Sequence, residues 1–159
     1  MVGDQAGLQL LEVRPGVGIG PISIDMTRDE ARAAGSGAGL QASDFLRGAG
    51  QADQPTSGSM DLSFGGQLFA YFHGGDLVEE VEVAVSGPLP VALLDVDLRA
   101  SYSDVLRAMR AHGPVDATHH EYPSTSVFPE LGLSLWADVI ADDMSEVNVE
   151  AVLVRRSVP

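Results

Sequence analysis

The chain has 159 residues, of which 45% are apolar and 20% are charged, a balance typical of a globular protein rather than a disordered one. Its 23 acidic residues outnumber nine basic residues, all of them arginine, which gives a formal net charge of −14. Such a negative field repels phosphate backbones and speeds association with basic proteins, so direct binding to nucleic acid is disfavoured. The same acidity could serve solubility alone.

The first elements are a predicted strand, a turn and a helix. Residues 8–14 alternate weakly between apolar and polar types, and the glycines and prolines of residues 15–21 favour a turn. Thr27 and Glu30 have the types and spacing of a capping box, so a helix is predicted from Thr27 to near Gly35.

A glycine-rich stretch separates this helix from a group of strands. Residues 35–59 are predicted to form a loop with one helical turn at 43–47. Alternation then returns, with paired glycines as turn signals. An antiparallel meander is therefore predicted, with strands at 61–64, 67–73 and 78–85.

The start of this pattern recurs about 74 positions later. Residues 22–24 lead to Met26 and Thr27, and residues 96–98 lead to Ala100 and Ser101. The recurrence predicts an α+β fold of two tandem helix-plus-antiparallel-sheet units in one body, at 1–86 and 87–159. The second unit is predicted to have a strand at 93–98, a helix capped by Ser101 and Asp104, and strands at 131–136 and 147–154.

This order of elements resembles the duplicated fold of β-lactamase-inhibitor proteins. It is also similar to the helix-plus-sheet units of BamE-like lipoproteins of outer-membrane assembly, whose helix entry reads Gly, Met, Thr or Ser, a polar residue and an acid. Residues 26–30 match that entry, Asp25 replaces the glycine, and the second unit keeps only Ser101 and Asp104. The resemblance covers residues 15–155 in outline. It implies that such units bind another protein on the open sheet face, with aromatic side chains supplying contacts.

Strand alternation predicts which residues such a face would carry, because alternate residues point to opposite sides of a sheet. The outer side is predicted to carry Gln67, Phe69, Tyr71, His73, Glu80 and Glu82, with the lone Trp136 joining them from the second unit. Aromatic anchors beside carboxylates are typical of a surface that binds a protein. The alternative is that these rings fill the seam between the units or lie under the 35–59 loop.

Titratable clusters offer a second kind of site. His119, His120 and Glu121 combine imidazole and carboxylate groups, which suit zinc binding or acid and base catalysis. Neighbouring side chains on a strand point to opposite faces, however, so a solvated loop is favoured there. The acidic residues 138, 142, 143 and 146 lack the spacing of a calcium loop and are expected to keep a hairpin turn charged.

The sequence indicates no catalytic residue, no cofactor and no metal. With no cysteine, no membrane-spanning run and no secretion signal at residues 1–11, the chain is expected to be soluble, cytoplasmic and free of membrane contacts. The leading hypothesis is an inhibitory or immunity-type module that binds a basic protein. The alternative is a small enzyme or ligand-binding protein with a pocket between the halves, rimmed by His119, His120, Glu121 and Tyr122. A third is a subunit that dimerises through the sheet.

Overall fold

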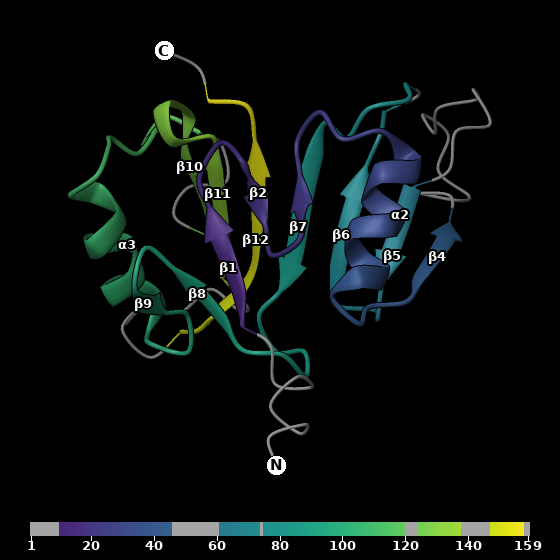
Figure 1. Ribbon diagram of the computed structural model, residues 1–159. Coiled ribbons are helices and arrows are strands. Elements are labelled where there is room, and N and C mark those ends of the chain that lie inside the picture. Colours follow the sequence, from purple (N-terminus) through teal and green to yellow (C-terminus); the bar gives the residue numbers. More distant parts are fainter. Residues whose placement is uncertain (1–9, 46–60, 74, 120–123, 138–146, 158–159) are drawn as a thin grey trace.

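The computed structural model describes residues 10–45, 61–73, 75–119, 124–137 and 147–157 (Figure 1). In this part of the chain the strands are β1 (Leu11–Arg14), β2 (Gly18–Ile19), β3 (Ile22–Ser23), β4 (Ala42–Phe45), β5 (Asp61–Phe64), β6 (Leu68–Tyr71), β7 (Glu80–Ala84), β8 (Val91–Leu93), β9 (Val96–Asp97), β10 (Thr125–Phe128), β11 (Leu133–Ala137) and β12 (Val149–Arg155). The helices are α2 (Arg28–Gly37), α3 (Tyr102–Arg110) and the short 3₁₀ helix η1 (Pro129–Leu131). The predicted α+β class is confirmed.

Seven strands form one large sheet in the order β10-β11-β12-β7-β6-β5-β4, with every neighbouring pair antiparallel. The predicted meander corresponds to β5, β6 and β7. Gly65 and Gly66 make its first turn at positive φ, a conformation that glycine adopts without a steric penalty. The pair β7–β12 joins a strand from the middle of the chain to the last described strand, at the centre of the sheet.

A small five-stranded sheet, β3-β2-β1-β8-β9, lies together with α2 and α3 on one side of the large sheet (Figure 1). Here β1 and β8 run parallel, which ties the start of the described chain to the segment that follows β7. We call the covered side of the large sheet its inner face and the opposite side its outer face. Neither α-helix in the described residues is long and apolar enough to cross a lipid bilayer.

The core is one apolar cluster between the inner face and its covering layer. The large sheet contributes Leu62, Phe64, Leu68, Ala70, Phe72, Val81, Val83, Phe128, Leu133, Leu135, Val152 and Val154, all at most 1% exposed. Alternation in the strands at 67–73 and 78–85 predicts the inward residues Leu68, Ala70, Phe72, Val81, Val83 and Val85, and all of them are buried except Val85, which is half-buried. Strand alternation thus predicts which side of each of these strands faces the core.

The capping signals for both helices are confirmed. The Thr27 side chain accepts a hydrogen bond from the Glu30 amide at 3.1 Å, and the Glu30 carboxylate accepts one from the Thr27 amide at 2.8 Å. Ser101 accepts from the Asp104 amide at 3.2 Å. These bonds satisfy amide groups that a helix start otherwise leaves unpaired. Helix α2 runs to Gly37, slightly past the predicted end.

Three local predictions were wrong. The helical turn at 43–47 is replaced in its described part by strand β4, which pairs with β5 at the sheet edge. The strand at 93–98 is a hairpin of β8 and β9, turned by Leu94 and Asp95 at positive φ. Gln67, predicted to point outward, is only 3% exposed, and its side chain donates to the carbonyls of Ala84 at the end of β7 and of Leu89 beyond it.

Gly35 and Gly37 provide a matched test of how α2 packs on the sheet. A methyl group at Gly35 would lie 2.5 Å from the Phe64 ring, whereas one at Gly37 would meet nothing within 4 Å. We expect Gly35→Ala to lower the free energy of unfolding by about 1 kcal/mol, because overpacking outweighs the gain in helix propensity. Gly37→Ala should raise it by about 0.5 kcal/mol. Urea titrations of both variants measure the difference, and a stabilising Gly35→Ala would contradict this packing.

Candidate functional site

The outer face of the large sheet gathers most residues of the predicted binding face. Phe69 and Tyr71 on β6 lie opposite Glu82 and Glu80 on β7, respectively, and all four side chains are half-buried. Residues two apart on a strand share a side, so strand alternation alone places these four together. The sequence prediction of this group is consistent with the register.

Phe45 joins this group from edge strand β4 and was not predicted. Its ring contacts those of Phe69 and Tyr71 edge to face, with centroid distances of 6.1 Å and 6.3 Å. Such contacts stabilise aromatic side chains beyond the area they bury. We call the set Phe45, Phe69, Tyr71, Glu80 and Glu82 the aromatic–acidic face.

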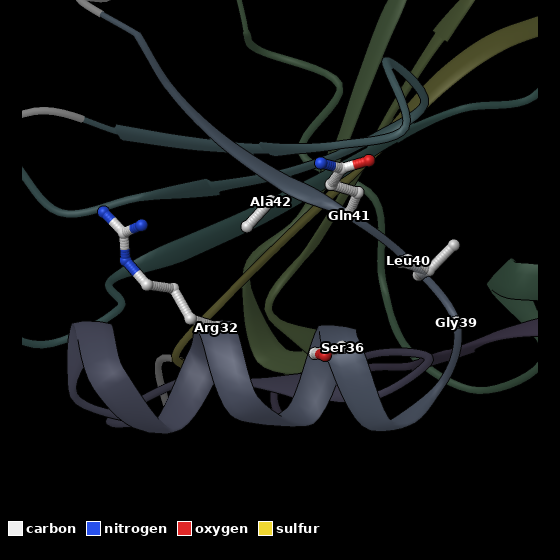
Figure 2. Close-up of a pocket in the computed structure, with 6 residues that line it drawn as sticks. All are labelled: Arg32, Ser36, Gly39, Leu40, Gln41 and Ala42. Carbon is white, nitrogen blue, oxygen red and sulfur yellow. The ribbon is translucent and has the colours of Figure 1, made fainter.

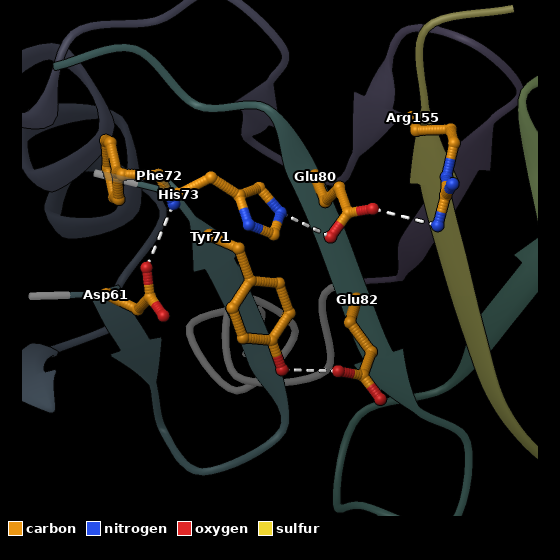
Figure 3. A network of polar contacts seen from close by, with 7 residues as sticks. All are labelled: Asp61, Tyr71, Phe72, His73, Glu80, Glu82 and Arg155. Carbon is orange, nitrogen blue, oxygen red and sulfur yellow. Dashed lines mark hydrogen bonds and ion pairs between the residues drawn. The ribbon is translucent and has the colours of Figure 1, made fainter. Parts of the chain in front are cut away.

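Glu80 is held between two basic side chains at one border of this face (Figure 3). Its carboxylate lies 2.7 Å from Nε2 of His73 and 2.8 Å from the guanidinium of Arg155, and 16% of the side chain is exposed. Arg155 comes from β12, so the network spans the central strand pair. Because the guanidinium of Arg155 carries a permanent positive charge, the negative charge of Glu80 is already matched within the chain.

Glu82 has a different environment. Its carboxylate accepts a hydrogen bond from the Tyr71 hydroxyl, as Figure 3 shows. Among the described residues no arginine or histidine forms an ion pair with Glu82, and its cross-strand neighbour on β12 is Leu153. Within the described residues, Glu82 thus carries a negative charge without an ion-pair partner, next to the rings of Phe69 and Tyr71.

The end of β6 is fixed by a buried carboxylate. Asp61 is 5% exposed and accepts a hydrogen bond from the Phe72 amide at 2.9 Å. Phe72 in turn lies under the guanidinium of Arg28, 4.2 Å from the ring centroid. These contacts hold the chain from Tyr71 to His73 in place, although His73 itself adopts positive φ. They position the face rather than belong to it.

Trp136 lies on the same outer side but well away from the cluster. It is half-buried on β11, opposite Ala151 on β12. Two strands, β12 and β7, separate β11 from β6, which corresponds to about 14 Å at ordinary strand spacing. Trp136 therefore contributes to a second area of this face and not to the aromatic–acidic face.

The predicted histidine cluster is described only at one residue. The backbone amide of His119 donates to the Asp116 carbonyl at 3.3 Å, next to a turn in which Asp116 accepts from the Thr118 amide and hydroxyl. Those Thr118 hydrogen bonds lower the pKa of Asp116. His120, Glu121 and Tyr122, like the acidic residues 138, 142, 143 and 146, lie outside the described residues. Within the described ranges, no three metal-binding side chains come together.

Two open hollows lie away from the aromatic–acidic face. The first, about 530 Å³, lies between the end of α2 and the segment leading into β4 (Figure 2). Arg32 at its border is paired with Asp44, and the hydrogen bond that its guanidinium donates to that carboxylate raises the pKa of Arg32. The second, about 430 Å³, lies at the end of β7, beside Arg99.

Comparisons with protein-family models, with curated proteins and with solved structures found no match for this chain. Its function is therefore inferred from the geometry above.

Proposed function

We propose that this chain is a protein-binding module that takes a basic partner on the aromatic–acidic face and acts as an inhibitory or immunity-type protein. The observation that carries the proposal is the placement of Glu82, a carboxylate without an ion-pair partner among the described residues, beside the rings of Phe69 and Tyr71. Binding energy at protein interfaces concentrates in such partly buried aromatic groups, and charges around them select the partner.

The partner surface that fits best carries an arginine or lysine. An extended basic side chain can lie across the Tyr71 or Phe69 ring and place its cationic group next to Glu82, which combines a cation–π contact with a charge-assisted hydrogen bond. The net charge of −14 would draw such a partner in from a distance. A phosphate-bearing partner fits poorly for the same reason.

The chain is further proposed to consist of two tandem units, residues 1–86 and 87–159, as the resemblance to β-lactamase-inhibitor proteins implies. Three features support this. Each helix cap forms an isolated antiparallel β-bridge with a residue that precedes the final strand of its unit. Thr27 pairs in this way with Leu77, and Ser101 pairs with Asn148. The sheet order places β5-β6-β7 and β10-β11-β12 as mirror sequences around the β7–β12 pair. Corresponding positions, Glu82 and Leu153, lie opposite each other at its centre.

Capture from the native lysate at two salt concentrations tests the function. The immobilised chain should retain a basic protein at about 0.05 M salt and release most of it near 1 M, because screening shortens the reach of the Glu82 charge and of the acidic field. A Glu82→Gln chain, which keeps the acceptor for Tyr71, should retain less, whereas Asp104→Asn on α3 makes the same charge change elsewhere and should not. A retained protein that ignores both salt and Glu82→Gln would count against the proposal.

A ligand-binding role for the joint between the units is favoured by one observation, the hollow beside Arg99. Its lining combines one basic and one acidic side chain with apolar groups.

A further inference from the structure

The hollow beside Arg99 lies where three separate segments meet. Residues 85–87 after β7, residues 98–99 before α3 and residues 148–150 at the start of β12 line a space of about 430 Å³. The Val85 amide donates to the Glu150 carbonyl at 2.9 Å, so the walls are tied together by the sheet itself. This volume is within the range of small-molecule sites.

The opposite end of the β7–β12 pair carries an ion pair at the corresponding place. There, Arg156 just after β12 forms an ion pair with Asp25, two residues before the Thr27 helix cap. In the proposed two-unit arrangement, with Glu82 and Leu153 as the paired centre, the position that matches Arg156 at the other end is Val85. The position two residues before the Ser101 cap is Arg99.

The two ends therefore differ in the sign of one charged residue and in the length of one side chain. Val85 is too short to occupy the space that an arginine fills, and Arg99 stands where the other end has the carboxylate of Asp25. Among the described residues no carboxylate forms an ion pair with the Arg99 guanidinium, and none of the arginines or histidines does so with Glu150. Arg99 and Glu150 both line the hollow, so its wall includes one cationic and one anionic residue.

We propose that this hollow binds a small zwitterion of the α-amino acid class. The ligand carboxylate pairs with the guanidinium of Arg99, which matches carboxylate geometry through two parallel hydrogen bonds. The ammonium group pairs with Glu150, and an aliphatic side chain rests on Val85 and Val149. A simple anion would be opposed by Glu150 and by the net charge of −14, and a simple cation by Arg99.

Titration of the ¹⁵N-labelled chain with L-leucine tests the proposal. The amides of Gly87, Arg99 and Asn148 should shift together and saturate with a Kd near 1 mM, because the site is open. N-acetyl-leucine keeps only the carboxylate and leucinamide only the ammonium, so each should bind at least about tenfold more weakly.

Arg99→Gln and Glu150→Gln assign the two charges. Both side chains belong to exposed residues, so folding should be preserved, and Arg107→Gln and Glu130→Gln on α3 and η1 serve as matched controls. Arg99→Gln should bind leucine no more tightly than leucinamide, because the partner of the carboxylate is lost. Glu150→Gln should bind leucine no more tightly than N-acetyl-leucine, because the partner of the ammonium group is lost. Absence of shifts at about 10 mM leucine, or equal binding by Arg99→Gln and Arg107→Gln, would overturn the proposal. Neither result depends on the aromatic–acidic face.

Discussion

Replacing Gln67 with leucine should lower the free energy of unfolding by about 2 to 3 kcal/mol. The Gln67 amide group donates to the carbonyls of Ala84 and Leu89, both at 2.9 Å, and its carbonyl accepts from the Leu89 amide at 2.9 Å. Leucine keeps nearly the same volume, so the loss comes from backbone groups left unpaired in a largely buried place and not from a cavity. Urea denaturation monitored by circular dichroism measures the change.

Two variants show whether that loss comes from the proposed bonds. Gln41→Leu makes the same chemical change at an exposed position and should alter stability by less than about 0.5 kcal/mol. A methyl group at Gly87 would lie 2.4 Å from Cδ of Gln67, so Gly87→Ala should destabilise the natural chain. In a chain that already carries Gln67→Ala, the same substitution should lower the free energy of unfolding much less. Additive effects of these two substitutions would show that Gln67 does not hold the segment after β7.

Truncating Phe69 or Tyr71 to alanine should weaken binding of the captured basic partner about 30-fold each, which corresponds to roughly 2 kcal/mol. Both rings are half-buried and contact Phe45, so each presents a preorganised surface with little side-chain freedom left to lose on binding. Calorimetry with the purified partner gives the affinities, and the unfolding transition of each variant shows how far the sheet itself is affected.

A matched substitution separates binding from general surface effects. Val17→Ala removes an exposed apolar side chain in the turn between β1 and β2, on the covered side of the sheet, and should leave the affinity unchanged. If Val17→Ala and Tyr71→Ala weaken binding equally, or if neither does, the partner binds elsewhere. Trp136→Ala should have a smaller effect than Tyr71→Ala, because Trp136 lies beyond the aromatic–acidic face.

The parts of the fold that could be predicted are those specified by neighbouring residues. Thr27 and Glu30 meet within one helical turn, and Gly65 and Gly66 both mark and make a tight turn, so these features were visible in the sequence. The β8–β9 hairpin was missed because Leu94 and Asp95, not glycines, adopt its positive φ angles. The preceding residue, Leu93, is fully buried, which helps to hold the turn in this conformation.

The parts of the site that could not be predicted depend on partners distant in sequence. Phe45 lies in a short edge strand of mostly exposed residues, and only pairing with β5 brings its ring to Phe69. Arg155 reaches Glu80 because β12 pairs with β7, which alternation in either strand does not reveal. Gln67 looks outward-facing by alternation, and only the position of Leu89 explains its burial.

The β7–β12 pair has a consequence for how the chain acquires its structure. During synthesis β7 leaves the ribosome long before β12, so one edge of β7, with Val81 and Val83, has no strand to pair with for much of that time. Closing such a distant contact is slow, because the entropy of the long intervening segment must be lost before the pairing contributes any stability. The nascent chain therefore passes through a stage in which an apolar strand edge is open to other chains, and this stage ends only when β12 inserts.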